Sequence, residues 1–241
     1  MSEPRTILCM RWGTAYGAQD VAILHAMVRR HLPGDFRFLC LTDDLTPIAE
    51  GIELRPIPPI VQPRAKSGSP WRKLALFAPE LADLGGQALF IDLDVVVLDD
   101  LTPFFTLPGE FCIIENWTQP GQGIGNSSVF RFRPGAHPQI HAEYMADPER
   151  IAEGFANEQS FVSRRISPLT WWPAEWVRSF KRHCVQPFPL NLFRPPNLPA
   201  GARIVAFHGT PKPADAIAGR WPGGGLFRHL RPTPWVAGNW R

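Results

Sequence analysis

The chain has 241 residues, of which 44% are hydrophobic and 20% charged, a balance typical of a globular protein with an apolar core. Its net charge of +3 does not indicate a nucleic-acid partner, and no stretch approaches the roughly 18 unbroken apolar residues of a membrane-spanning helix. The first six residues are mostly polar, so we expect no signal peptide.

The four cysteines lie far apart and form neither a Cys-x-x-Cys pair nor a metal-binding spacing. Three of them fall in apolar, strand-like runs, which predicts buried free thiols in a reducing compartment. We therefore expect a cytoplasmic protein, one that could sit peripherally at the inner face of the membrane.

The first part of the chain alternates strand and helix patterns. Apolar runs at residues 6–10, 36–41 and 52–57 predict strands, and residues 12–19, with two glycines, predict a loop after the first. Asp20 can cap the helix that follows, in which apolar residues recur on one face. Strand, helix and strand in this order favour a parallel sheet with crossover helices, and hence an α/β fold.

A proline-rich stretch at residues 56–70 predicts a surface loop. The Ser-Pro pair at its end favours the start of a short helix over residues 71–78. A buried strand at residues 88–91 follows, and the apolar sequence resumes at residues 95–98.

The rest of the chain predicts more strands and a helical region. Residues 111–115 and 128–132 predict strands, separated by a glycine-rich loop at residues 121–125. Residues 140–165 are predicted to be mostly helical, and residues 203–207 form one further strand, after which the tail is predicted to be loop. No internal repeat or domain linker interrupts the chain.

The strongest chemical signal is Asp92-Leu93-Asp94, directly after the apolar strand. On a continuing strand, residues two apart point the same way, so the two carboxylates repel unless a cation lies between them. Carboxylate oxygens suit Mg²⁺ or Mn²⁺, and ligands bind at the carboxyl ends of strands in open α/β sheets. The simpler alternative is two solvated acids at a turn.

A second signal ends the last predicted strand, where His208 is followed by Gly209 and then Lys212. A neutral imidazole can complete a metal site begun by carboxylates, and an ammonium group can neutralise a phosphate. Taken alone, His208 also fits a hydrogen-bonded structural role.

The Asp-x-Asp pattern also fits phosphatases of the haloacid dehalogenase type, which need a second acidic site downstream. Neither Asp147 nor Asp215 follows an apolar strand as part of a pair, and about ninety residues precede the motif here. The sequence therefore disfavours the phosphatase interpretation without removing it.

Together, Asp92-Leu93-Asp94, His208-Gly209 and Lys212-Pro213 resemble glycosyltransferase family 8 and related bacterial glycosyltransferases, of the nucleotide-diphospho-sugar transferase superfamily. The resemblance covers about residues 6–213. Two further segments resemble donor-binding parts of the family: residues 12–16 are similar to a uridine-binding loop, and residues 71–74 to a segment whose basic residue reaches the donor. Two others resemble the sugar pocket: residues 125–128 are similar to its asparagine segment, and residues 157–159 lie where relatives carry Asp-Gln.

The resemblance implies a single GT-A-type α/β domain over residues 1–241, with a mixed, mostly parallel central sheet. The nucleotide-binding half would cover about residues 1–100, and the acceptor and sugar half about residues 101–241. The implied reaction moves a hexosyl unit from a nucleoside diphosphate sugar, first of all a UDP-sugar, to a hydroxyl acceptor such as a sugar, a lipid-linked sugar or a protein. Anomeric configuration would be retained, and the role would lie in bacterial surface polysaccharide synthesis.

The resemblance also implies roles for individual residues. Mn²⁺ or Mg²⁺ would be held by Asp92, Asp94 and His208. The donor would be bound by Gly13, Tyr16, Arg72, Lys73, Asp92, Leu93, Asp94, Asn126, His208, Gly209 and Lys212, and the catalytic residues would be Gln159, Glu158 and Lys212.

Two departures leave alternatives open. Glu158 stands where the family usually has Asp, and Ala214 where a Trp often follows Lys-Pro. Both leave the donor sugar open, and they allow a non-catalytic protein of the same fold that binds nucleotide sugars or carbohydrates.

Several residues also have simpler structural explanations. Tyr16 could pack on the sheet edge, Asn126 could be a turn residue, and Gln159 could lie on a helix surface. Arg72 and Lys73 could cap a helix or pair with Asp83. The three tryptophans, Trp171, Trp172 and Trp176, could belong to the core rather than form a platform for the acceptor sugar.

Overall fold

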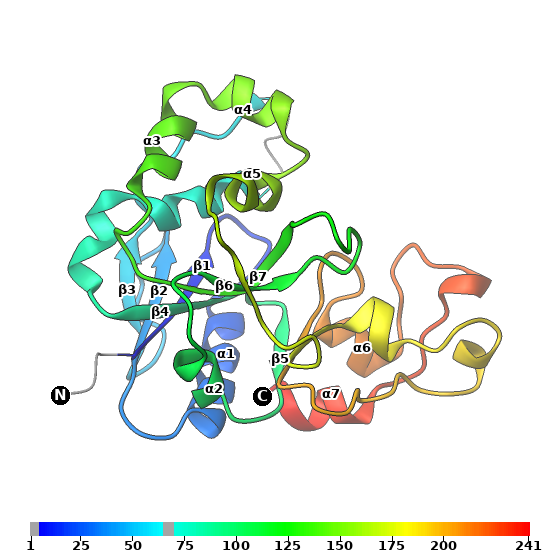
Figure 1. Ribbon diagram of the computed structural model, residues 1–241. Helices are drawn as coiled ribbons and strands as arrows, with labels where there is room; N and C mark the ends of the chain where they lie inside the picture. The colour runs from blue at the N-terminus through cyan, green and yellow to red at the C-terminus, as the bar shows by residue number, and fades with distance from the viewer. Residues whose placement is uncertain (1–4, 65–69) are drawn as a thin grey trace.

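The structure, a computed structural model, describes residues 5–64 and 70–241. Within this part of the chain the main sheet has seven strands in the order β3-β2-β1-β4-β7-β6-β8 (Figure 1). They are β1 (Arg5–Arg11), β2 (Arg37–Thr42), β3 (Glu53–Pro56), β4 (Gln87–Ile91), β6 (Cys112–Glu115), β7 (Gly125–Phe132) and β8 (Thr170–Trp171). Only the two pairings of β7 are antiparallel among these strands, so the prediction of a mixed, mostly parallel sheet in an α/β fold is confirmed.

Both faces of the sheet are buried, which explains the continuous apolar runs of its strands. Successive residues of β1 point to opposite sides. Ile7 packs into a cluster that includes α1 (Ala18–His31), whereas Leu8 packs into a second cluster that includes η2 (Pro70–Phe77).

Helices cover the two faces in separate groups (Figure 1). One face carries α1 and α2 (Thr102–Thr106), and the other carries η2, η3 (Pro79–Leu84), α3 (Pro138–Ala146), α4 (Pro148–Gly154) and α5 (Glu158–Arg165). The predicted helical region at residues 140–165 therefore consists of three short helices. Asp147 starts α4 and Asn157 starts α5, because each side chain accepts a hydrogen bond from a backbone N–H group in the first turn of its helix.

A second, three-stranded sheet extends the fold from the end of β4. It consists of β5 (Val95–Val97), β10 (Ile204–Ala206) and β9 (Val177–Ser179), with β10 between the other two. Because β5 and β10 are antiparallel, the residues before β5 lie beside those after β10, and the Phe207 N–H donates to the Asp94 carbonyl oxygen at 2.8 Å. The pairing brings Asp92 and Asp94 to the same end of the molecule as His208.

The prediction of a loop-like tail is wrong. The tail contains α6 (Pro213–Ala218) and α7 (Pro234–Asn239), besides a turn of 3₁₀ helix, η6 (Leu226–Arg228). Each of the α-helices is too short to show a periodic pattern, but α6 has local signals at both ends. The Lys212 N–H donates to the Asp215 carboxylate at 3.0 Å, and Gly219 ends the helix in the left-handed conformation.

Smaller details also differ from the predictions. The helix at residues 70–77 is a 3₁₀ helix, and Asp20 lies inside α1, where its carboxylate accepts from the Gly17 N–H. Part of the predicted proline-rich loop, residues 65–69, lies outside the described residues. All four cysteines are buried and free, as predicted for the three in apolar runs. None of the described helices is both long and apolar enough to cross a bilayer.

Candidate active site

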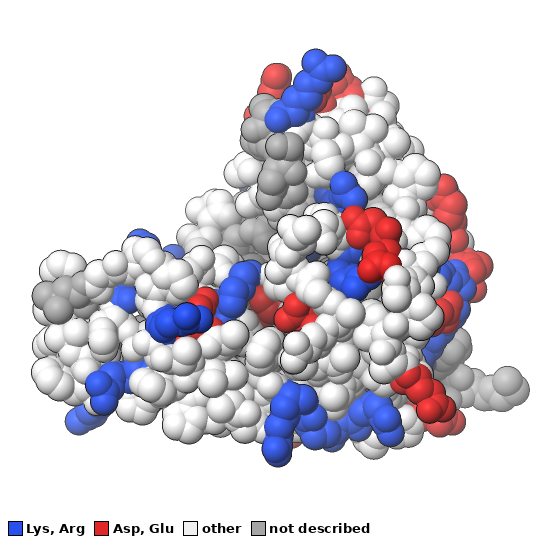
Figure 2. Space-filling model, turned by 180° about the vertical axis from the view of Figure 1, so that it is seen from behind, with Lys and Arg blue, Asp and Glu red and all other residues white. Residues whose placement is uncertain are grey.

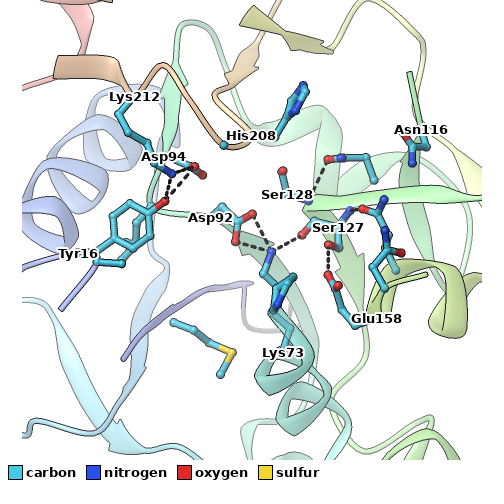
Figure 3. Close-up of a pocket in the computed structure, with 18 of the residues that line it drawn as sticks. Tyr16, Lys73, Asp92, Asp94, Asn116, Ser127, Ser128, Glu158, His208 and Lys212 are labelled. Atoms are coloured by element: carbon cyan, nitrogen blue, oxygen red, sulfur yellow. Dashed lines mark hydrogen bonds and ion pairs between the residues drawn. The ribbon is translucent and has the colours of Figure 1, made fainter. Parts of the chain in front are cut away.

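A cavity of about 550 Å³ lies where the carboxyl ends of β1 and β4 meet the second sheet (Figure 3). This volume is typical of sites for small molecules, and the position is the one at which open α/β sheets bind ligands. Its walls come from the loop after β1, η2, residues 92–94, residues 116–118, the start of β7, the start of α5 and residues 208–212.

All predicted site residues except Gly13 and Arg72 line this cavity. Gly13 instead shapes the turn after β1, where its φ is +60° and its N–H donates to the Asp43 carboxylate at 2.9 Å. Arg72 borders a separate recess of about 290 Å³ that Asp43 also lines. Donor-binding roles for Gly13 and Arg72 therefore stay predictions.

Each carboxylate of the Asp-x-Asp pair is bound by a lysine (Figure 3). Lys73 Nζ lies 2.7 Å from Asp92, and Lys212 Nζ lies 2.6 Å from Asp94. Tyr16 donates its hydroxyl hydrogen to Asp94 at 2.9 Å and also contacts the Lys212 ammonium group. The two lysines compensate the negative charge that the strand end concentrates in the cavity.

Burial controls the protonation of this group. It raises the pKa of Asp92 to about 6, and Lys73 opposes the rise. Burial disfavours the charged form of Lys73, but Asp92 and Glu158 together hold its pKa above the usual value. Burial, reinforced by Asp94, also raises the pKa of Tyr16, so the phenol stays protonated and serves as a donor.

Ser127 connects the Lys73–Asp92 pair to the opposite wall of the cavity. Its hydroxyl donates to Glu158 Oε1 at 2.7 Å, and its N–H donates to Gln159 Oε1 at 3.2 Å. Its carbonyl oxygen accepts from Lys73 at 3.3 Å. The Glu158 side chain is only 2% exposed, and its second oxygen, Oε2, has no hydrogen-bond partner in the described part of the chain. Burial raises the pKa of Glu158, while Lys73 and the Ser127 hydrogen bond oppose the rise.

His208 lines the cavity without touching the aspartates. Its Nε2 lies 2.6 Å from Ser179 Oγ, and its ring stacks on Trp117 with centroids 5.5 Å apart. Burial, with the nearby charge of Lys181, lowers the pKa of His208 to about 4, so the ring is neutral at neutral pH.

The two carboxylates supply oxygen donors that suit Mn²⁺ or Mg²⁺, and a neutral imidazole is a common metal ligand. However, no three His, Cys, Asp or Glu side chains of the described residues are close enough to hold a metal ion in this arrangement. The predicted metal site is therefore not assembled, and ligation by Asp92, Asp94 and His208 stays a prediction.

One wall of the cavity consists of residues that were not predicted from the sequence. Asn116, Trp117 and Thr118 line it directly after β6, and Asn116 is 3% exposed. Polar residues after an apolar strand were the signal that identified Asp92, and the same signal is present at Asn116.

The structure decides between several of the simpler explanations. Asp83 pairs with Arg55 at 2.7 Å, so it is not the partner of Lys73. Trp172 is buried in the core with Trp176 packed against it, and neither lines the cavity. Asn126 fits both the structural and the donor-binding interpretation. Its side chain accepts a hydrogen bond from the Ser128 N–H at 3.1 Å, and it also lines the cavity.

Comparison with known proteins gives matches to solved structures alone. No family model matches the chain, and no curated protein matches it. The galactosyltransferase LgtC, crystallised with donor and acceptor sugar analogues, matches with a TM-score of 0.59 at 14% identity, over 86% of this chain and 88% of LgtC. An active-site Gln-to-Glu mutant of LgtC matches with a TM-score of 0.60.

Two larger glycosyltransferases match over about half of their length. GlyE of Streptococcus pneumoniae TIGR4 has a TM-score of 0.58 at 16% identity, over 87% of this chain and 56% of GlyE. The bifunctional WbbM has a TM-score of 0.60 at 13% identity, over 88% of this chain and 47% of WbbM. Likeness at such low identity is a likeness of fold, and the chain has the GT-A fold of these glycosyltransferases.

Proposed function

We propose that this protein is a metal-dependent glycosyltransferase that moves a hexosyl unit from a nucleoside diphosphate sugar to a hydroxyl acceptor. The observation that carries the proposal is the cavity at the end of β4, in which Asp92 and Asp94 face Lys73 and Lys212. LgtC, which shares the fold, holds donor and acceptor sugar analogues. A UDP-sugar is our first candidate for the donor.

We assign Asp92, Asp94 and His208 to the metal, because carboxylate oxygens suit Mn²⁺ or Mg²⁺ and a neutral imidazole is a common metal ligand. A bound divalent cation would supply positive charge that stabilises a diphosphate leaving group. Lys212 supports the same purpose: its ammonium group lies in the cavity wall, and negative charge develops on the diphosphate as the bond to the sugar breaks.

We place the donor sugar beside Glu158 and Gln159. Both residues line the cavity, and their side-chain oxygens are of the kind that accept hydrogen bonds from sugar hydroxyls. Gln159 is the single glutamine in the described lining of the cavity, and a glutamine is the residue changed in the LgtC active-site mutant. The resemblance to glycosyltransferase family 8 implies retention of configuration, with Gln159 near the reacting carbon.

The test is release of UDP from a panel of UDP-sugars, with Mn²⁺, with Mg²⁺ and with EDTA. Wild type should turn over at least one donor only when metal is present. Asp94→Asn should lose at least roughly a hundredfold in rate, since it removes one charged group from the donor site. Asp99→Asn is the matched control, because Asp99 is an exposed acid that pairs with Arg203 outside the cavity.

A second candidate is a nucleotide-sugar-binding protein of the same fold without turnover. It is favoured by the two departures from the family's pattern, Glu158 in place of Asp and Ala214 in place of Trp. Tight binding of a UDP-sugar with no release of UDP, in the presence of any acceptor offered, would support it against the transferase. A role in bacterial surface polysaccharide synthesis is the setting we propose for the transferase.

A further inference from the structure

Charge is distributed unevenly along the chain. Residues 176–241 contain ten Lys and Arg but a single acidic residue, Asp215, whereas residues 1–175 contain 15 basic and 21 acidic residues. Figure 2 shows the end of the molecule formed by the C-terminal segment on the left, with basic side chains on its surface, while most acidic side chains in this view lie over the rest. The small net charge of the whole chain hides this basic segment.

The same segment exposes large apolar side chains at its far end. Phe193 and Phe227 are 74% and 73% exposed, more than any other large apolar side chain of the described residues. Leu190 and Phe188 are also exposed, and the Phe188 ring lies 4.8 Å from the Phe227 ring between centroids. We call these four residues the aromatic tip. Grouped exposed apolar side chains of this kind mark an interaction surface.

The aromatic tip is held in place by a buried side chain. Asn191, in η5 (Leu190–Leu192), is 2% exposed and donates from Nδ2 to the carbonyl oxygens of Phe227 and His229 at 3.1 and 3.2 Å. These bonds join the loop around η5 to η6, which lie together at the side of the molecule away from β3 (Figure 1). The exposure of the phenylalanines is therefore part of a fixed arrangement.

Unpaired cations flank the aromatic tip. Arg194 follows Phe193 and Arg228 follows Phe227 in the sequence, and both guanidinium groups are exposed. Neither forms an ion pair with a carboxylate of the described residues. Two aromatic side chains, each with an arginine beside it, match the requirements of the interface of a bilayer, where aromatic rings sit at the headgroup level and arginine binds phosphate.

Basic side chains also lie between the aromatic tip and the cavity. Burial, followed by the charge of Arg228, lowers the pKa of Lys181. Its Nζ also lies close to Gly209 in the cavity wall, 3.5 Å from where a Cβ would stand. A surface docked through the aromatic tip would thus leave the cavity close to the same surface.

We propose that the aromatic tip docks this protein on an anionic lipid bilayer, with the phenylalanines entering the headgroup region and Arg194 and Arg228 contacting lipid phosphates. Aromatic burial alone or charge alone gives weak, reversible binding, whereas the two together are the combination found in peripheral membrane proteins. The proposal stands on the exposed side chains and does not depend on transferase activity.

The test is co-sedimentation of the full chain with vesicles of phosphatidylcholine alone and of phosphatidylcholine mixed with phosphatidylglycerol. Wild type should bind the anionic vesicles, should bind the neutral ones far less, and should dissociate as salt is raised. Phe193→Ser with Phe227→Ser should lower the partition coefficient at least about tenfold. Arg194→Gln with Arg228→Gln should lower it by roughly fivefold for each arginine.

The matched control is Leu45→Ser with Arg164→Gln, which changes an exposed apolar and an exposed basic residue elsewhere and should leave binding unchanged. All variants should keep the thermal unfolding and UDP binding of wild type, so a failure of this proposal is distinct from a failure of the transferase proposal. Wild type that stays in the supernatant with anionic vesicles would overturn the docking proposal. Equal binding to neutral vesicles, or an equal loss in the control, would also overturn it. A dimer that disappears in the phenylalanine variant would assign the tip to a second copy of the chain instead.

Discussion

Replacing Lys73 by Met tests the charge balance of the cavity most sharply. The lysine and Asp92 are 2.7 Å apart, and their side chains are 10% and 20% exposed. Removing one partner of such a buried pair leaves an uncompensated charge and costs about 3–5 kcal/mol. Because Asp92 keeps some contact with water, we expect Lys73→Met to lower the free energy of unfolding by about 3 kcal/mol at neutral pH.

The pH dependence of this cost follows from the shifted pKa of Asp92. In the folded protein that pKa is about 6, against an ordinary value of 3.8, and loss of Lys73 removes the group that opposes the rise. A raised folded pKa means that the folded state takes up a proton as the pH falls, which removes the buried charge. The cost of Lys73→Met therefore shrinks as the pH falls through the folded pKa of Asp92 in the variant, which lies above the wild-type value of about 6.

Urea denaturation of four proteins in EDTA measures the effect: wild type, Lys73→Met, Asp92→Asn and the double variant. The double variant should be more stable than Lys73→Met alone, because the orphaned carboxylate is gone. A cost below about 1 kcal/mol for Lys73→Met, typical of an exposed pair, would refute the reasoning. A double variant that simply adds the two single losses would refute it as well.

Three further predictions concern the surroundings of this pair. Ser127→Ala removes the hydroxyl that donates to Glu158, so we expect the free energy of unfolding in urea to fall by about 1–3 kcal/mol. The rate of UDP release should fall about tenfold, and unchanged turnover would contradict the role of Ser127. An NMR titration of the metal-free protein should find the pKa of His208 near 4, well below its usual 6.5, and a value at or above 6.5 would show that the ring is solvated. Gly125→Ala should lower the free energy of unfolding by about 1–3 kcal/mol, because the added Cβ would stand 2.5 Å from the Ile113 side chain. An unchanged stability would mean that β6 shifts to make room for the Cβ.

The sequence predicts the main sheet and the core of the site well, for a physical reason. Parallel strands end at the same edge of a sheet, so polar residues after apolar strands meet there even when they are far apart in the chain. Asp92 and Asp94 were found in this way, whereas His208 reaches the cavity because β10 pairs antiparallel with β5. Asn116 follows the apolar strand β6 and obeys the same rule, although it was not among the predicted site residues.

Side-chain partners could not be predicted, because they depend on neighbours from distant segments. His208 contacts Ser179 because β9 pairs with β10, and the short β9 gives no pattern in the sequence. Lys73 could have paired with Asp83 as well as with Asp92, and only the packing of η2 against the sheet decides for Asp92. The role of Ser127 as a link between both walls also depends on three separate segments meeting.

The central claim is that Asp92 and Asp94 form a metal-assisted site for a nucleoside diphosphate. Isothermal titration of UDP into wild type and Asp94→Asn, each with and without Mn²⁺, tests it most directly. The account predicts clear binding to wild type with Mn²⁺, much weaker binding without it, and weak binding to Asp94→Asn in both conditions. No binding of UDP to wild type with Mn²⁺, or equal binding with and without the metal, would contradict it.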